Sequence, residues 1–154
     1  MKLMRQVREF AEMNDFKTEW DIRLPSSMVD PLVGLILKRA AKQLRVVQED
    51  LAEVVGCDLR TDRAHLLVEE LAELFEGMAE RDIIETSDGL ADLAYVVAGT
   101  AATFGLPLDA LCDEVHASNM SKDFGEHKPV KGDRYFAPDI RRVLETNMTL
   151  RSQR

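Results

Sequence analysis

The sequence predicts an all-α fold, an antiparallel helical bundle of four to five main helices. Three observations support this prediction: apolar residues recur at intervals of three and four, Ala, Leu and Glu are abundant, and only five prolines and eight glycines interrupt 154 residues. This length suffices for one hydrophobic core and is small for two. We therefore expect a single domain over residues 1–154, and the 45% hydrophobic and 31% charged content is typical of globular proteins.

Apolar periodicity, caps and helix breakers divide the chain into six helical segments, at about 2–13, 32–55, 62–80, 87–104, 108–121 and 138–146. Residues 14–31, with two prolines and no sustained period, are predicted to form a loop. Thr61 or Asp62 is the expected N-cap of the third helix. Gly56 and Gly105 follow predicted helix ends, where glycine is common.

Charge and composition exclude several classes of function. A net charge of −8, from 28 acidic and 20 basic residues, repels a phosphate backbone, so duplex nucleic acid is not an expected partner. The N-terminal residues contain no apolar signal segment, and we expect a cytoplasmic protein without a membrane partner. Cys57 and Cys112 lie far apart and form no C-x-x-C pair, which argues against a disulfide or a zinc site.

Three glutamates form an E-E-x-x-E pattern on the third predicted helix: Glu69, Glu70 and Glu73. Spacings of three and four residues place their side chains at neighbouring positions on the helix surface, where like charges repel. With Leu67 at the centre of the apolar stripe and about 100° per residue, Glu70 lies roughly 60° from that centre. Glu70 is therefore expected to border the core.

The next predicted helix contains a second acidic pair. From Gly89 to Gly105 the segment has one charged residue, Asp92, among apolar and small residues. A helix that is apolar on every side is expected to be buried, and an isolated buried carboxylate is costly unless it is paired or binds a metal ion. Asp88 lies four residues earlier on the same face, near the helix start, where the helix dipole favours negative charge.

Antiparallel packing of these two helices would gather both sets of carboxylates with few cations nearby. Such a cluster is stable mainly as a cation site, and all-oxygen ligands favour Mg²⁺, with Mn²⁺ as a substitute, over zinc. We therefore predict that four residues bind metal: Glu70, Glu73, Asp88 and Asp92. The alternative is a solvated acidic face with ordinary charge pairs.

The motifs E-E-L-A-E at 69–73 and D-G-L-A-D at 88–92 resemble the MazG-like all-α NTP pyrophosphohydrolase superfamily. Its signature is E-E-x-x-E on one helix and E-x-x-D on the next. The resemblance covers about residues 64–141. It includes D-E-V-H-A-S-N-M-S-K at 113–122 and K-G-D-R-Y-F-A-P-D at 131–139, which are similar to the small phage and bacterial branch.

One position departs from the signature, because the glutamate of E-x-x-D falls on Gly89. Asp88, shifted by one position, is the expected substitute. Aspartate is one methylene shorter than glutamate, so the number of direct metal ligands stays open. The segment 32–56 has no clear counterpart in the superfamily.

The resemblance implies Mg²⁺-dependent hydrolysis of a nucleoside triphosphate or deoxynucleotide between its α and β phosphates, which releases a monophosphate and pyrophosphate. Such a nucleoside triphosphate diphosphatase would serve in nucleotide-pool house-cleaning. Metal ions would neutralise phosphate oxygens and lower the pKa of a bound water. Glu69 and Glu70 are the catalytic candidates, and Glu69 is expected to orient or deprotonate that water.

The C-terminal part supplies the expected substrate contacts. Lys122 and Lys131, with Arg134, are predicted phosphate clamps. Asn119 has donors and acceptors to read a base or sugar edge, and Tyr135 could stack on a base. Each is equally consistent with an ordinary structural role: a surface lysine, a residue at the end of a helix, or a packing residue under the tail. The motif core spans about 62–122, followed by a predicted flexible basic loop at 122–137.

Three alternatives remain from the sequence. Phosphoribosyl-ATP pyrophosphohydrolase shares the helix pair, although such chains are usually shorter and have no comparable tail. A non-catalytic nucleotide-binding module would result if Gly89 has removed activity. A purely structural helical bundle would leave the carboxylates solvated. Small residues such as Ala98 and Ala101 favour close helix approach, and the resemblance implies a homodimer or homotetramer.

Overall fold

The computed structural model describes residues 2–14, 30–123, 125 and 128–152, and this part of the chain is all-helical, as predicted. Apart from an isolated antiparallel bridge between Asp123 and Val130, the described residues contain no β-structure. The six α-helices are α1 Lys2–Met13, α2 Pro31–Ala52, α3 Leu59–Glu80, α4 Ile83–Thr103, α5 Leu108–Met120 and α6 Ile140–Ser152. The predicted loop at 14–31 falls almost entirely outside the described residues.

The chain divides into two compact units. The central unit is Ile22–Phe104 and contains α2, α3 and α4, and the terminal unit combines Met1–Asp21 with Gly105–Arg154 and contains α1, α5 and α6. The single domain expected over 1–154 stays a prediction. Among the described residues no single helix is long and apolar enough to cross a membrane, and only α4 and α5 taken together reach that length and composition.

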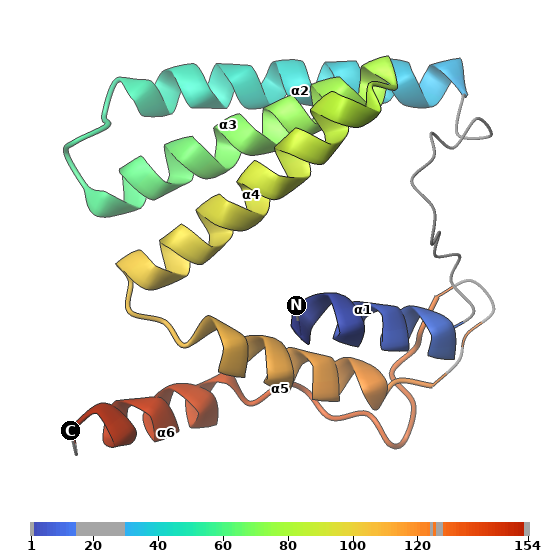
Figure 1. Cartoon of the computed structure of the whole chain (residues 1–154), viewed down its shortest axis with the longest axis vertical. Coiled ribbons are helices and arrows are strands. Elements are labelled where there is room, and N and C mark those ends of the chain that lie inside the picture. Colours follow the sequence, from blue (N-terminus) through green and yellow to red (C-terminus); the bar gives the residue numbers. More distant parts are fainter. Residues whose placement is uncertain (1, 15–29, 124, 126–127, 153–154) are drawn as a thin grey trace. The chain divides into compact units, whose positions relative to one another are not determined.

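In the central unit α3 packs against α2 on one side and α4 on the other (Figure 1). Both pairs are antiparallel. Lys38 in the first half of α2 pairs with Glu80 at the end of α3 at 3.5 Å, and Arg63 near the start of α3 donates to Thr100 near the end of α4 at 3.2 Å. The packed positions of α3 are small or apolar and include Ala72, Leu74 and Gly77, all buried. The helix that contains the E-E-x-x-E motif is therefore the middle layer of this unit.

Two glycines allow α3 and α4 to approach closely. A Cβ atom added at Gly77 would lie 2.8 Å from the backbone nitrogen of Thr86. One added at Gly89 would lie 2.9 Å from Cα and 3.0 Å from the backbone nitrogen of Leu74. No real side chain tolerates such distances to backbone atoms, so both helices depend on the missing side chains for their spacing.

Aspartates begin the helices of the central unit, in two places earlier than predicted. Asp58, not Thr61 or Asp62, is the N-cap of α3, and its side chain accepts a hydrogen bond from the backbone N–H of Arg60 at 2.7 Å. Asp62 instead accepts from the backbone N–H of Gly56 at 2.6 Å. α4 begins at Ile83, four residues before the predicted start, because Asp82 caps it directly after α3 ends.

The ends of these helices follow their local chemistry. α2 ends at Ala52, three residues short of the prediction, and Gly56 then adopts φ +84°, a conformation that suits glycine. Arg81 ends α3 at φ 62°, and its N–H reaches the carbonyl groups of Gly77 and Met78. α3 and α4 are thus joined by two residues, which keeps the two acidic motifs on adjacent antiparallel helices.

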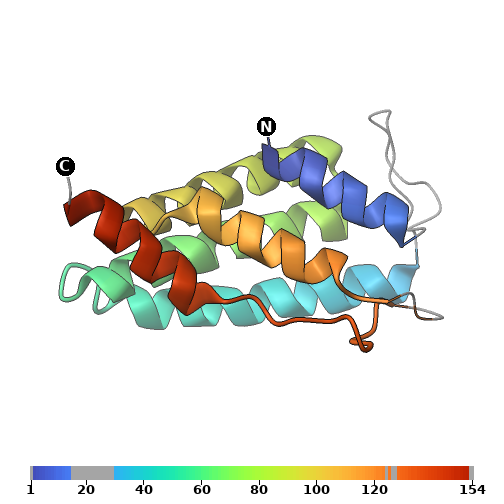
Figure 2. The ribbon, with the colours of Figure 1, turned by 90° about the horizontal axis from the view of Figure 1, so that it is seen from below.

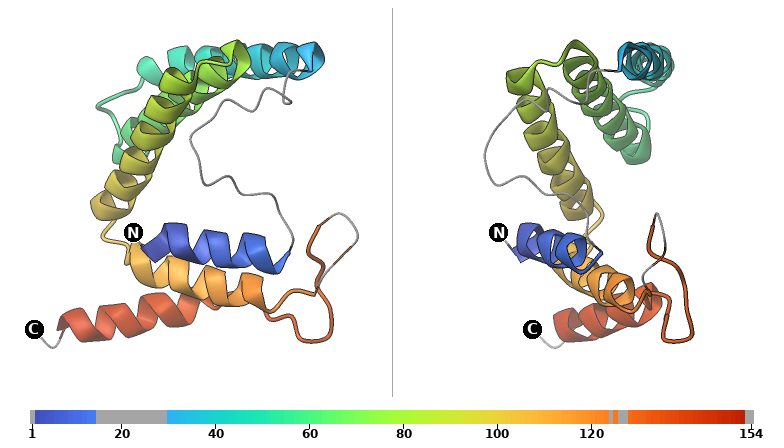
Figure 3. Two further views of the ribbon diagram at one scale, coloured as in Figure 1. Left: turned by 45° about the vertical axis from the view of Figure 1, so that its right-hand side comes forward. Right: turned by 90° about the vertical axis from the view of Figure 1, so that its right-hand side faces the viewer.

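In the terminal unit α5 lies between α1 and α6 (Figure 3). α1 runs parallel to α5, since Lys2 and Gln6 bond to Asp113 and Glu9 lies 3.5 Å from His116. The hydrogen bonds from Lys2 and Gln6 lower the pKa of Asp113, and the Lys2 hydrogen bond is the first cause. An apolar groove of about 470 Å³ lies between α1 and α5, lined in part by Leu3, Val7, Phe10, Leu111 and Val115.

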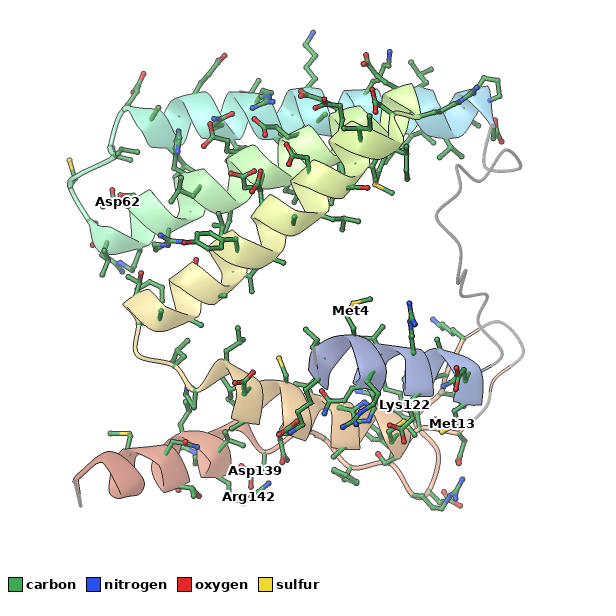
Figure 4. All side chains as sticks on the ribbon, viewed as in Figure 1. Met4, Met13, Asp62, Lys122, Asp139 and Arg142 are labelled. Carbon is green, nitrogen blue, oxygen red and sulfur yellow. The ribbon has the colours of Figure 1, made fainter. Side chains whose placement is uncertain are left out.

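After α5 the chain returns along this helix before α6 begins (Figure 2). Two serines at the C-terminus of α5 bond to the backbone of Phe136 in this returning segment. The Ser118 hydroxyl donates to the Phe136 carbonyl oxygen at 2.8 Å, and the Ser121 hydroxyl oxygen accepts from the Phe136 N–H at 3.1 Å. α6 begins at Ile140, not Pro138, and continues to Ser152, beyond the predicted end near Asn147. Asp139 and Arg142 lie together at its start, where both bond to Glu114 of α5 (Figure 4).

We predict that Gly89→Ala destabilises the chain. The added methyl group would meet the Leu74 backbone at 2.9 Å, and overpacking of this kind costs about 1–3 kcal/mol. Gly34→Ala in α2 is the matched control, because its nearest contact is an ordinary 3.4 Å and alanine improves helix propensity by up to about 1 kcal/mol. Urea unfolding of the two variants measures both effects, and equal stability would contradict the tight crossing of α3 and α4.

Candidate active site

The two acidic motifs meet where α3 crosses α4. Glu70, in the middle of α3, has an oxygen, Oε2, that is buried and has no hydrogen-bond partner. No other side-chain nitrogen or oxygen in the described part of the chain has both properties. An unsatisfied buried acceptor is costly and calls for an explanation such as an ion or a bound water. Glu70 borders the core, in agreement with its position about 60° from the apolar stripe.

The environment of Glu70 raises its pKa above the ordinary value. Burial is the first cause, because it disfavours the charged carboxylate. Four neighbouring carboxylates add to the shift through their charges: Glu73, Asp92, Glu69 and Asp88. The structure therefore brings together all five acidic residues predicted from the sequence for catalysis or metal binding, and α4 contributes two of them.

The other two glutamates of the motif face α2. Glu73 Oε1 lies 3.6 Å from a terminal nitrogen of Arg45, and the guanidinium of Arg45 donates two hydrogen bonds to the carboxylate of Glu76, at 2.8 and 3.1 Å. These contacts raise the pKa of Arg45, with the Glu76 hydrogen bond as the first cause. Glu69 accepts a hydrogen bond from the side-chain amide of Gln48 at 3.0 Å. The motif is thus partly compensated on the α2 side.

Burial on α4 differs from the prediction. Asp92 is exposed, and so are its neighbours Leu90 and Tyr95, so α4 is not apolar and buried on all sides in this chain. The residue at the family position of the missing glutamate, Gly89, is buried instead. Asp88 is exposed and lines a shallow surface hollow that begins at the start of α4. The carboxylate with a buried oxygen is therefore that of Glu70, and Asp92 lies at the solvent-exposed side of the cluster.

An arginine further along the same crossing has no counterpart in the sequence prediction. Arg63, two turns before Glu70 on α3, donates to the carbonyl oxygen of Val96 at 3.0 Å and to the hydroxyl of Thr100 at 3.2 Å. It covers Gly99, where an added Cβ would lie 2.9 Å from the guanidinium. Arg63 thus joins the two helices without neutralising the carboxylates. The glycine at position 99, which leaves room for the guanidinium, is the sequence signal that could have indicated this contact.

The predicted substrate residues lie in the terminal unit, each with a partner of its own. Lys122, at the end of α5 (Figure 4), donates to the side-chain oxygen of Asn119 at 2.8 Å. Arg134 pairs with Asp123 at 2.6 Å. Lys131 lies over the ring of Tyr135, with its ammonium 4.8 Å from the ring centroid. In this arrangement the cationic groups are engaged within the loop, and the flexibility of this loop stays a prediction.

The donor set suits a hard divalent cation. All five groups are carboxylates, the ligand type that Mg²⁺ and Mn²⁺ prefer, and one of their oxygens is buried without a partner. The groups are neighbours and not a closed shell: no three acidic, histidine or cysteine side chains among the described residues enclose a metal position. Repulsion between like charges and the attraction of Arg45 for Glu73 both favour a spread arrangement.

An all-helical chain with E-E-x-x-E and D-x-x-x-D carboxylates on adjacent antiparallel helices has the site architecture of the all-α pyrophosphohydrolases. The phosphoribosyl-ATP pyrophosphohydrolase family matches residues 37–119, which is more than half of the chain. The chain belongs to this family, and through it to the MazG-like all-α superfamily of hydrolases that act on phosphoanhydride bonds. No curated protein and no solved structure matches it.

The matched range also shows what the sequence reasoning missed. It includes most of α2, for which no counterpart was predicted, and it ends at Asn119, before the tail at 131–139. α2 is therefore part of the family core, together with the two helices that contain the acidic motifs. This assignment agrees with the contacts of Arg45 and Gln48 with the motif glutamates.

We predict that Glu70→Gln stabilises the metal-free chain at neutral pH. A carboxyl whose pKa is raised in the folded state favours folding at low pH, and this contribution is lost as pH rises through the folded pKa. A neutral amide removes that loss. Thermal unfolding in EDTA between pH 4 and pH 8 measures it: the melting temperature of the variant should exceed that of the parent mainly at the upper end.

Glu80→Gln, at the exposed end of the same helix, is the control. Its carboxylate pairs with Lys38 at the surface, so it should give no gain at any pH. An equal gain from both variants would attribute the effect to net charge and not to the buried site.

Proposed function

We propose that the chain is a Mg²⁺-dependent nucleoside triphosphate pyrophosphohydrolase that cleaves a ribo- or deoxynucleotide between the α and β phosphates. The products would be the corresponding monophosphate and pyrophosphate. The buried, unpartnered oxygen of Glu70 amid four other carboxylates is the observation that supports this most directly. Membership of a pyrophosphohydrolase family supports the reaction class.

The proposed roles follow from the different environments of the acidic groups. Glu70, Glu73, Asp88 and Asp92 would hold the cation, with Mn²⁺ as a possible substitute. When bound, Mg²⁺ supplies charge neutralisation for phosphate oxygens and acidifies a bound water. Glu69 is the motif glutamate with a neutral hydrogen-bond donor, and it would orient or deprotonate the attacking water. Glu70 would contribute to catalysis through its contact with the cation.

Further residues are proposed to contact the substrate. Lys122, Lys131 and Arg134 are proposed phosphate clamps, because the negative charges of a triphosphate need cationic partners. Asn119 and Tyr135 are proposed to contact the nucleoside. Each has an internal partner in the free chain, so substrate binding would exchange these contacts for contacts with the nucleotide.

Phosphoribosyl-ATP is the second candidate substrate, and the family match favours it. It presents the same α–β phosphoanhydride, so the acidic cluster alone does not distinguish the two. A non-catalytic nucleotide-binding module is the remaining alternative, since Gly89 offers no carboxylate at the signature position. We further propose a cytoplasmic house-cleaning role and a homodimer or homotetramer, as small residues on α4 favour close helix contacts.

We predict that Glu73→Gln and Asp92→Asn each abolish most of the turnover. Both changes keep the shape of the side chain and remove one negative charge from the proposed cation site, a loss on the scale of about 10²–10³-fold in kcat. Pyrophosphate release with Mg²⁺ measures activity, and circular dichroism checks helicity. Mg²⁺ should raise the melting temperature of the parent chain and not of the two variants.

Asp50→Asn is the control for these substitutions, because Asp50 is an exposed acidic residue of α2. It lowers the acidic charge equally and should leave kcat and the Mg²⁺ effect unchanged. Full activity in both Glu73→Gln and Asp92→Asn would discredit the assigned site.

We predict that deoxynucleoside and nucleoside triphosphates are hydrolysed with a higher kcat/KM than phosphoribosyl-ATP. The two substrates share the scissile bond, so the difference reports on contacts beyond the phosphates. Chromatography of the products with Mg²⁺ present identifies both the bond cleaved and the preferred substrate. A higher kcat/KM for phosphoribosyl-ATP would assign the chain to the second function, and nucleotide binding without product would assign it to the module.

A further inference from the structure

A chain of hydrogen bonds connects α2 with the E-E-x-x-E motif. Glu76 of α3 holds the guanidinium of Arg45 at both of its oxygens, at 2.8 and 3.1 Å. Another terminal nitrogen of Arg45 donates to the side-chain oxygen of Gln48 at 2.9 Å. The side-chain nitrogen of Gln48 then donates to Oε1 of Glu69 at 3.0 Å. This series of hydrogen bonds begins at one carboxylate of α3 and ends at another, and it passes through two residues of α2.

This series of hydrogen bonds fixes the orientation of the Gln48 amide. A guanidinium has donors only, so the side of Gln48 that faces Arg45 has to be its oxygen. The amide nitrogen consequently points to Glu69, which as a carboxylate only accepts. Arg45 is itself held in place by two bonds to Glu76, a geometry that a guanidinium provides and an ammonium group does not. The positive charge also polarises the amide and strengthens its N–H donor.

Gln48 therefore gives Glu69 an environment that neither of the other motif glutamates has. Glu69 has a neutral donor on one oxygen, Glu73 lies beside a positive charge, and Glu70 has a buried oxygen with no partner. A neutral donor restricts the rotation of a carboxylate without cancelling its charge. The carboxylate then remains available as a proton acceptor in a defined orientation.

We propose that Gln48 is a positioning residue for Glu69 and that Arg45, anchored on Glu76, holds Gln48 in its donating orientation. This inference rests on the proposed function, in which Glu69 orients or deprotonates the attacking water. Gln48 acts on the reaction only through Glu69. It affects kcat and leaves the affinity for the cation unchanged, because Glu69 is not one of the four proposed ligands.

The first test compares Gln48→Met with Gln43→Met. Methionine retains the volume of glutamine and removes both hydrogen bonds, and Gln43 is an exposed glutamine of the same helix. We expect Gln48→Met to lower kcat by about 10- to 100-fold, the usual effect of losing a residue that orients a site carboxylate. KM and the Mn²⁺ dissociation constant, measured by electron paramagnetic resonance, should change less than about twofold, and Gln43→Met should match the parent chain.

A double-mutant cycle tests whether the effect passes through Glu69. In a Glu69→Gln background, Gln48→Met should cause no further loss of kcat, because the residue that it positions no longer acts. Gln48→Asn gives the same information if the methionine variant fails to fold: it keeps the amide but is too short to reach both partners. It should lower kcat to a similar extent and lose this effect in the same background.

A measurement on the metal-free chain needs no turnover. The side-chain NH₂ signals of Gln48 in a ¹⁵N-correlated NMR spectrum should shift on Glu69→Gln and on Arg45→Lys, and those of Gln43 should not. Unshifted Gln48 signals would overturn the hydrogen-bond chain itself. Unchanged kcat in Gln48→Met, or losses that multiply in the double variant, would overturn the positioning role while the proposed function stands. A parent chain that hydrolyses no nucleotide would overturn the proposed function and, with it, this role.

Discussion

The close crossing of α3 and α4 is the contact on which the site depends. Gly77 and Gly89 have no side chains at this crossing, and the two backbones approach to a distance that a Cβ atom would not allow. This proximity places Asp88 and Asp92 near enough to affect the ionisation of Glu70. Without it the motifs would be separate acidic patches. Close packing therefore produces the electrostatic conflict on which the proposed cation site is based.

The chain relieves only part of this conflict with its own cations. Arg45 compensates the negative charge on the side of the cluster that faces α2. Arg63 instead donates its hydrogen bonds to the backbone and a hydroxyl of α4. The buried oxygen of Glu70 has neither arginine as a partner. A fully compensated cluster would have little affinity for metal, and a fully uncompensated one would cost stability. The observed distribution leaves a local negative field within a folded helix pair.

Sequence periodicity predicted the helices well because the local sequence, with its amphipathic pattern, is enough to determine each helix. The N-caps were predicted less well: Asp58 and Asp82 lie four and five residues before the predicted starts, and several nearby aspartates and threonines could serve equally. The carboxylate set was predicted from the spacing of the glutamates and from the lone Asp92 in an apolar segment, and Glu70 lies at the core boundary as its angle on the helix indicated. The burial of Asp92 was wrong, since an apolar sequence does not show which face of α4 a neighbour covers. The contacts of Arg45 and Gln48 link α2 to α3 across 21 to 31 positions, which no local pattern reveals.

Gly89 lies where the superfamily signature has a glutamate, and its place is closed by the backbone of Leu74. The residue at position 89 therefore determines the spacing of the helices, and it has no side chain that could bind a ligand. A glutamate at position 89 of this chain would need a wider gap between the same two helices, with bulkier residues to fill it. At this residue the chain therefore has a short packing distance in place of a ligand.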